Sequence, residues 1–283
     1  MRESRSPSVR RRRLAAELRR LREQAGFTAE QASSQLGWSK GRLNRWEANQ
    51  WTRPDLSALR DLLRLYKITD EKQDAILELA RLSRQKGWWA DYKDLFGEGA
   101  FIGLEAEASS MRSYQPAIVP GLLQTADYAT ALIEGARMYE PGEVQRRVDA
   151  RLARQELLKQ SPAPQLWAII EEAVLHRLIG GPEVMTRQLQ ALVAANDQSH
   201  INIQVILNSS GAHAGLGGQF VILDFPSQVD PSVVFLDTPT ESLLLERADQ
   251  LSPYNLLYQH VGAAAVSPRE SSALMQELAE RLR

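Results

Sequence analysis

Polar side chains gather on one side of a short helical pattern at residues 41–48. At 100° per residue, Leu43, Trp46 and Glu47 share one face of such a helix. The opposite face carries small or polar side chains, namely Gly41, Asn44, Arg45 and Ala48, and Lys40 and Arg42 flank its start. Forked donors on a flat helix face match base edges and phosphates in a DNA major groove. For each residue taken singly, an ordinary solvated helix face is the alternative.

The residues before this face predict a second helix and a tight turn. Thr28 and Gln31 have the spacing of a capping box, in which each side chain bonds the other's backbone N–H. Gly37 permits the left-handed turn that ends a helix, and Ser39 is placed to cap the next one. Helix, glycine turn and capped helix together are the helix-turn-helix layout.

Leucine spacing predicts the neighbouring helices. Leu14, Leu18 and Leu21 recur at three and four residues, which predicts an amphipathic first helix that stops near Gly26. A fourth helix is expected to start at Pro54, and a fifth to run from about Asp70 through Leu82.

Four consecutive arginines, Arg10 to Arg13, lie near the chain start. They predict either a disordered basic tail or an arm that reaches a minor groove or phosphates, and either adds salt-dependent affinity.

Charge divides the chain into two parts. Residues 1–86 hold 20 Lys and Arg against 11 Asp and Glu, a balance of +9, whereas residues 87–283 hold 14 against 24, a balance of −10. A basic part joined to an acidic part suggests an anion-binding module that carries a separate acidic one. Charge alone is equally consistent with a solvated surface.

Residues 12–67 resemble the Xre (Cro/CI-type) helix-turn-helix repressors. The resemblance rests on Leu18–Glu23, Gly26–Thr28, Leu36–Ser39 and Leu43–Glu47. It implies a five-helix module, Lys40, Gly41 and Arg45 in base-reading places, Arg42 in a backbone-contacting place, and a buried ion pair between Arg22 and Glu47. The candidate DNA-contacting residues are therefore Ser39, Lys40, Gly41, Arg42, Asn44 and Arg45, together with Thr28, Arg53, Arg12 and Arg13.

Three positions depart from that pattern. Ala29 stands where many members carry a DNA-contacting Gln, Ser33 stands where a packed Ala is usual, and Asn49 replaces a glycine after the third helix. Asn tolerates the left-handed conformation, but the missing Gln prevents a recognition code from being copied.

The acidic part predicts a helix-and-strand domain. Helices are expected at 121–134, 143–158, 182–195, 253–264 and 268–282. A strand is expected at 165–170, followed by four short, mostly antiparallel strands at 201–207, 218–225, 232–236 and 241–245. Helices first, a sheet later and helices last form an α+β arrangement.

This part, from about Leu104 to Arg283, also resembles a domain of unassigned function that follows Xre modules in many actinobacterial regulators. The string Val119 to Thr125 is the most specific match, with further matches at Gly180–Pro182, Gly211–Gly215 and Ser267–Ser271. The group includes WhiJ-like developmental regulators and antitoxin-like proteins. The resemblance implies that this domain binds a small partner protein, often encoded nearby.

No enzymatic motif is found. His176, His200, His213 and His260 have no metal-ligand spacing, and there is no cysteine. Glu171 and Glu172 adjoin a strand end, where adjacent carboxylates are usually solvated, and His213 lies in a loop, where histidines are usually exposed. Residues 211–218 hold four glycines but fit no phosphate-binding motif, so a hairpin-type loop is expected. We expect no catalytic residue, metal or cofactor.

Together these observations predict an α+β protein: an N-terminal all-α, five-helix helix-turn-helix domain followed by a larger α+β domain with a mostly antiparallel sheet. The expected divisions are a basic arm at 1–11, the DNA-binding domain at 12–86, a linker at 87–103 and the acidic domain at 104–283.

The predicted function is sequence-specific regulation of transcription by a homodimer that binds a palindromic double-stranded operator and, through its acidic domain, a small protein. An antitoxin-like protein and a small-molecule-sensing repressor are the alternatives. Neither a membrane span nor a signal peptide is recognisable in the sequence, so we expect a soluble, cytoplasmic protein.

Overall fold

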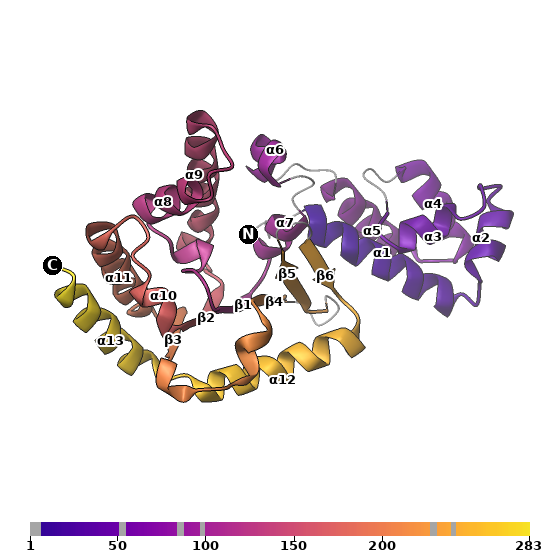
Figure 1. Cartoon of the computed structure of the whole chain (residues 1–283). Coiled ribbons are helices and arrows are strands. Elements are labelled where there is room, and N and C mark those ends of the chain that lie inside the picture. Colours follow the sequence, from indigo (N-terminus) through magenta and orange to yellow (C-terminus); the bar gives the residue numbers. More distant parts are fainter. Residues whose placement is uncertain (1–6, 51–54, 84–87, 97–99, 227–230, 239–241) are drawn as a thin grey trace. The chain divides into compact units, whose positions relative to one another are not determined.

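The leucine spacing near the N-terminus produces a long first helix that buries Leu14, Leu18 and Leu21. The computed structural model describes residues 7–50, 55–83, 88–96, 100–226, 231–238 and 242–283 (Figure 1). The described residues up to Glu107 form one compact unit, and those from Ala108 onward form a second. No helix in these ranges is long and apolar enough to cross a membrane.

The first unit is entirely helical within the described residues. Its helices are α1 (Pro7–Gln24), α2 (Ala29–Gln35), α3 (Arg42–Glu47), α4 (Leu56–Leu65), α5 (Asp70–Leu82), η1 (Trp88–Tyr92), α6 (Lys93–Phe96) and α7 (Ala100–Glu105). Leucines of α1 and α4 form the core together with Leu43 and Trp46 of α3 and Ile76 of α5. The predicted five-helix module is therefore present.

Two expectations about the ends of this unit are wrong. The arm expected at 1–11 is helical from Pro7, and Arg10 is buried, with its guanidinium donating to the Leu82 carbonyl at 3.1 Å. The last carbonyls of a helix lack partners within it, so this arginine satisfies the end of α5. The segment 87–103, expected as a linker, contains short helices and buries Trp89 and Ile102.

The second unit combines one sheet with helices. Its helical elements are η2 (Gly121–Leu123), α8 (Ala126–Gly135), α9 (Pro141–Gln155), η3 (Glu156–Lys159), α10 (Glu172–His176), α11 (Pro182–Asn196), η4 (Asn208–Ser210), η5 (Ala214–Gly217), α12 (Ala248–Ala264) and α13 (Pro268–Arg281). Its strands are β1 (Ser110–Gln115), β2 (Gln165–Glu171), β3 (Ile201–Ile206), β4 (Phe220–Asp224), β5 (Val233–Asp237) and β6 (Ser242–Leu245). The predicted α+β class is confirmed.

In the described residues the strand order is β3-β2-β1-β4-β5-β6. The pairings of β4 with β1, of β5 with β4 and of β6 with β5 are antiparallel, whereas β1 with β2 and β2 with β3 are parallel. The sheet is thus mostly antiparallel, as predicted. The expected succession of four neighbouring strands is wrong at one point, because β3 and β4 are separated by β2 and β1.

The loop 207–219 consequently crosses from the edge strand β3 to β4 and is not a hairpin. Periodicity identified the strands on both sides of it but carried no information about which strands pair. Gly215 lies against Tyr114 of β1 in this crossing: a Cβ atom built on Gly215 would lie 2.5 Å from Tyr114 Cζ. The crossing therefore requires a glycine at this position.

Side chains cover the outer edge of β3. The amide of Asn196 on α11 accepts from the Ile203 N–H at 2.6 Å, and the Ser271 hydroxyl on α13 accepts from the Val205 N–H at 3.0 Å. An uncovered edge strand invites pairing with other chains. These two helices therefore protect this edge of the sheet.

The helix α12 covers one face of the sheet (Figure 1). Its buried Leu251, Tyr258 and Val261 pack on a cluster that includes Tyr114, Ile169 and Phe220, and Tyr258 donates its hydroxyl to the Trp167 carbonyl at 3.1 Å. This packing fixes α12 across the strands from β2 to β5.

We predict that Gly215→Ala destabilises the second unit by about 1–3 kcal/mol, because the added methyl group must displace the buried Tyr114 ring. Gly217→Ala is the matched control in the same loop, since its Cβ would meet no atom within 4 Å. Chemical denaturation of both variants checks the prediction, and equal stabilities would contradict it.

Candidate nucleic-acid interface

Local capping forms α2 as the sequence predicts. The Thr28 hydroxyl accepts from the Gln31 N–H at 3.1 Å, and the Gln31 side chain accepts from the Thr28 N–H at 2.8 Å. Gly37 follows the helix with a φ of 64°, in the left-handed region that glycine adopts without strain. The exposed Thr28 side chain, a candidate DNA contact, therefore also caps this helix.

The start of α3 differs from the prediction. Ser39 is not the cap: the helix begins at Arg42, behind Gly41, which has a φ of 82° and contributes no side-chain cap. The Ser39 carbonyl accepts from the Arg42 N–H at 3.1 Å within the preceding turn. The left-handed Gly41 breaks the helical path between Ser39 and Arg42, which delays the helix by two residues. Gly41 therefore has a backbone role in addition to its small size.

The two faces of α3 are those that helical periodicity predicts. Leu43 is fully buried and Trp46 nearly so, while Asn44 and Arg45 are exposed on the opposite side. Within the described residues, no hydrogen-bond or ion-pair partner is found for the Arg45 guanidinium. Lys40 is also exposed, and its ammonium lies 3.5 Å from the exposed carboxylate of Glu30. Surface pairs of this kind contribute little, so Lys40 is available to other anions.

The implied ion pair between Arg22 and Glu47 is present. Arg22 donates from Nε and Nη2 to the two Glu47 carboxylate oxygens at 2.8 and 3.0 Å, and from Nη1 to the Phe27 carbonyl at 2.8 Å. The side chains are 14% and 8% exposed, respectively. Hydrogen bonding to Glu47 raises the pKa of Arg22 above its usual value, so the arginine stays charged. It ties α1 to α3 and fixes how α3 presents its polar face.

Arg42 makes contacts with other residues of the same unit. Its guanidinium lies 4.5 Å from the Trp38 ring centroid and 5.2 Å from that of Trp46, and it donates to the Asp55 carboxylate at 3.2 Å. Asp55 caps α4 by accepting from the Ser57 and Ala58 N–H groups, and these bonds hold the pKa of its carboxyl below the usual range.

Sequence reasoning missed the stacking of Arg42 on these two tryptophans. The signal was the spacing of Trp38 and Trp46, which lie four residues before and after Arg42.

The remaining candidate contacts divide as follows. Arg12 and Arg13 are half-buried on α1, so neither belongs to a free arm. Arg53 lies outside the described residues, as does Pro54, the expected start of the fourth helix; the described helix α4 begins at Leu56. The structure therefore brings together the exposed Lys40, Asn44 and Arg45 and the half-buried Gly41 as one surface, which we call the α3 face.

In the second unit, two side chains expected to be exposed are largely shielded from solvent. The side chains of Glu171 and His213 are 14% and 6% exposed, and His213 Nε2 lies 3.2 Å from Glu171 Oε1. The Tyr114 hydroxyl donates to the same oxygen at 2.6 Å. His213 Nδ1 accepts from the Gly215 N–H at 3.2 Å, which orients the Nε2 side of the ring toward Glu171.

This Tyr114–Glu171–His213 cluster anchors the crossing loop, and burial, then hydrogen bonding to Glu171, raises the pKa of Tyr114. Sequence spacing could not reveal it, because its members come from three separate segments. The neighbouring Glu172 has a different role: it lies 3.2 Å from His176 and accepts from the Asn208 N–H at 2.7 Å. No group of residues able to hold a metal ion is found in the described parts of the chain.

Comparison with known families separates the same two parts. Residues 13–76 match the model of a Helix-turn-helix domain. Residues 99–277 match the model described as Domain of unknown function (DUF5753). The chain belongs to the DUF5753 family. No curated protein and no solved structure matches it.

In this DUF5753 protein, the helix-turn-helix match and the geometry around α3 support a DNA-binding regulator of the Xre type in the broad sense.

We predict that Glu47→Gln destabilises the first unit by about 3 kcal/mol, because it removes the shielded, bidentate counterion of Arg22 and leaves only the exposed Glu23 carboxylate, 3.6 Å away. Glu78→Gln on α5 is the control: Glu78 pairs with Arg81 at 3.4 Å, but both side chains are more than half exposed, so the change stays below about 0.5 kcal/mol. Hydrogen exchange of the α1 and α3 amides measures the stability of the first unit in each variant, and equal protection in the two variants would contradict the prediction.

Proposed function

We propose that this protein is a sequence-specific transcriptional regulator that binds double-stranded DNA as a homodimer. Its α3 face would lie in the major groove, where Lys40, Asn44 and Arg45 would contact base edges. Two copies would read half-sites about 34 Å apart in a palindromic operator. The observation that carries the proposal is an exposed polar face on a helix that a partly buried ion pair holds in place.

Each side chain has a different part in this proposal. Arg45 is exposed and uncommitted within the described residues, so its forked donors are available to a guanine edge. Arg42 supports the face indirectly, since its stacking on two tryptophans and its bond to Asp55 hold α3 against α4. Arg12, Arg13, Ser39 and Thr28 are proposed as phosphate contacts that position the protein without reading sequence. Arg53 belongs to the same set.

We further propose that the acidic second part binds a small partner protein encoded nearby, as in the WhiJ-like and antitoxin-like regulators that the sequence resembles. Two observations support this. Residues 87–283 carry a balance of −10, which suits a basic partner. The second unit also exposes large apolar side chains, including Trp167, Leu178, Leu216 and Leu243. Binding of the partner would change DNA binding by the first unit.

We predict that Arg45→Ala lowers discrimination between the operator and random DNA by about 1–3 kcal/mol, because one base contact is lost. The operator is first selected from a random library with the full chain at about 150 mM salt, and both affinities are then measured at that salt. Arg60→Ala removes an equal charge from an exposed position on α4 and should leave discrimination unchanged. Full discrimination in Arg45→Ala would show that α3 does not read the groove.

For the partner, we expect the full chain and the small protein encoded beside it to elute together from size exclusion after co-expression. The complex should weaken when salt is raised to about 1 M, since screening removes the attraction between acidic and basic surfaces. Separate elution at low salt would contradict partner binding without affecting the DNA proposal.

A further inference from the structure

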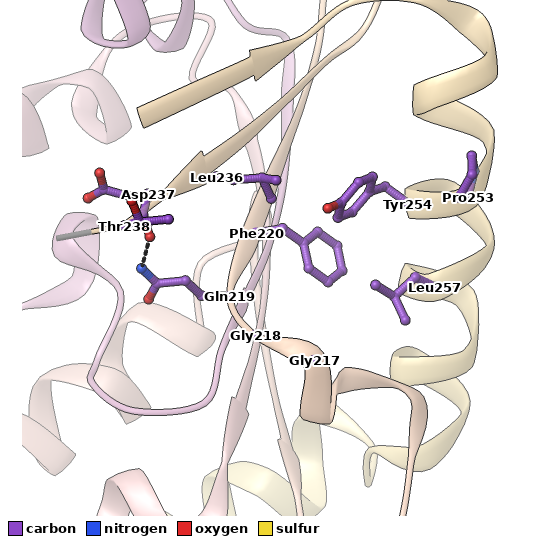
Figure 2. A pocket seen from close by; sticks show the side chains of 10 residues that line it. All are labelled: Gly217, Gly218, Gln219, Phe220, Leu236, Asp237, Thr238, Pro253, Tyr254 and Leu257. Atoms are coloured by element: carbon purple, nitrogen blue, oxygen red, sulfur yellow. Dashed lines mark hydrogen bonds between the residues drawn. The ribbon is translucent and has the colours of Figure 1, made fainter. Parts of the chain in front are cut away.

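A cavity of about 660 Å³ lies in the second unit, between α12 and the strands β4 and β5 (Figure 2). Its apolar lining comes from Phe220 on β4, Leu236 on β5, and Pro253, Tyr254 and Leu257 on α12. Cavities that hold small molecules in proteins span about 300–1,000 Å³ and have mostly apolar walls. The size and lining therefore match a site for a small molecule.

The aromatic rings in this cavity define a preferred ligand shape. The rings of Phe220 and Tyr254 lie 5.4 Å apart at 62°, edge to face. Figure 2 shows Phe220, Leu236 and Leu257 converging on the space in front of the Tyr254 ring. A flat ring system fits such walls, because aromatic rings prefer offset stacking or edge contact with one another.

The polar groups at the cavity favour an uncharged ligand. The Asp237 carboxylate accepts from the Ser242 hydroxyl at 2.7 Å and points away from the rings, and Gln219 donates to the Asp237 carbonyl at 3.0 Å (Figure 2). In the described residues no hydrogen-bond partner is found for the Tyr254 hydroxyl. A buried charge needs a counterion, whereas a single neutral polar group needs only one hydrogen-bond partner such as this hydroxyl.

The glycine-rich wall of the cavity is held in place before any ligand arrives. Gly217 and Gly218 line it, and they directly follow the segment that His213 anchors to Glu171. Gly215, two residues before Gly217, lies against the Tyr114 ring. A wall fixed by such contacts loses little conformational entropy on binding, which favours affinity.

We propose that this cavity binds a small, uncharged, mainly aromatic molecule that packs against the Tyr254 ring and Leu257 and pairs one polar group with the Tyr254 hydroxyl. This goes beyond DNA and partner binding and assigns a ligand site to the DUF5753 domain. The cavity lies in the second unit, and ligand binding is measured without DNA. Failure of the DNA-binding proposal would therefore leave this proposal unaffected.

The test uses N-phenyl-1-naphthylamine, a neutral aromatic amine with one N–H donor whose fluorescence rises in apolar surroundings. The full chain should bind it saturably with one site per chain. Leu257→Trp fills the cavity and should weaken binding at least tenfold. Leu256→Trp places the same side chain at the preceding position of α12, which is exposed and does not line the cavity, and it should leave binding unchanged. Non-saturable binding, or equal binding by the two tryptophan variants, would overturn the proposal.

A second variant covers the case in which Leu257→Trp perturbs folding. Tyr254→Phe keeps the ring and removes only the hydroxyl, so the loss of one hydrogen bond should weaken binding of the probe about threefold to tenfold. Thermal unfolding of each variant without the probe checks that the fold is retained. Unchanged affinity in a folded Tyr254→Phe variant would overturn the assigned hydroxyl contact.

Discussion

The guanidinium of Arg22 connects three segments of the first unit: the helix α1 that carries it, Glu47 at the end of α3, and the backbone of Phe27 before α2. A six-residue helix such as α3 has no stability of its own in water. Its orientation comes from the burial of Leu43 and Trp46 and from this shielded pair. A residue outside the α3 face therefore sets the geometry of the whole candidate interface.

In the second unit, Tyr114 likewise connects several segments. This buried ring lies on the central strand β1, contacts Phe220 on β4 and bonds Glu171 on β2. The crossing loop can pass over it only because Gly215 has no side chain. The same residue thus links the order of the strands, the position of the glycine loop and the shape of the wall of the cavity beside α12.

Local sequence signals predicted the helices and strands well, because capping boxes and leucine spacing act within a few residues. The predictions failed where distant segments decide. Arg10 appeared to belong to a tail because its partner, the Leu82 carbonyl, is 72 residues away. Ser39 appeared to be a cap because the left-handed Gly41 cannot be foreseen from capping preferences. Glu171 and His213 were expected in solvent because the pairing of their segments depends on the strand order.

The bidentate contact between Arg112 on β1 and Asp224 on β4 joins residues 112 positions apart. The strand β1 comes first along the chain yet lies inside the sheet, with β2 on one side and β4 on the other. During synthesis β2 and β3 follow β1 and precede β4. One side of β1 therefore stays unpaired until β4 has left the ribosome. Synthesis proceeds at about 5–20 residues per second. This order leaves one side of a central strand without its partner for several seconds of synthesis.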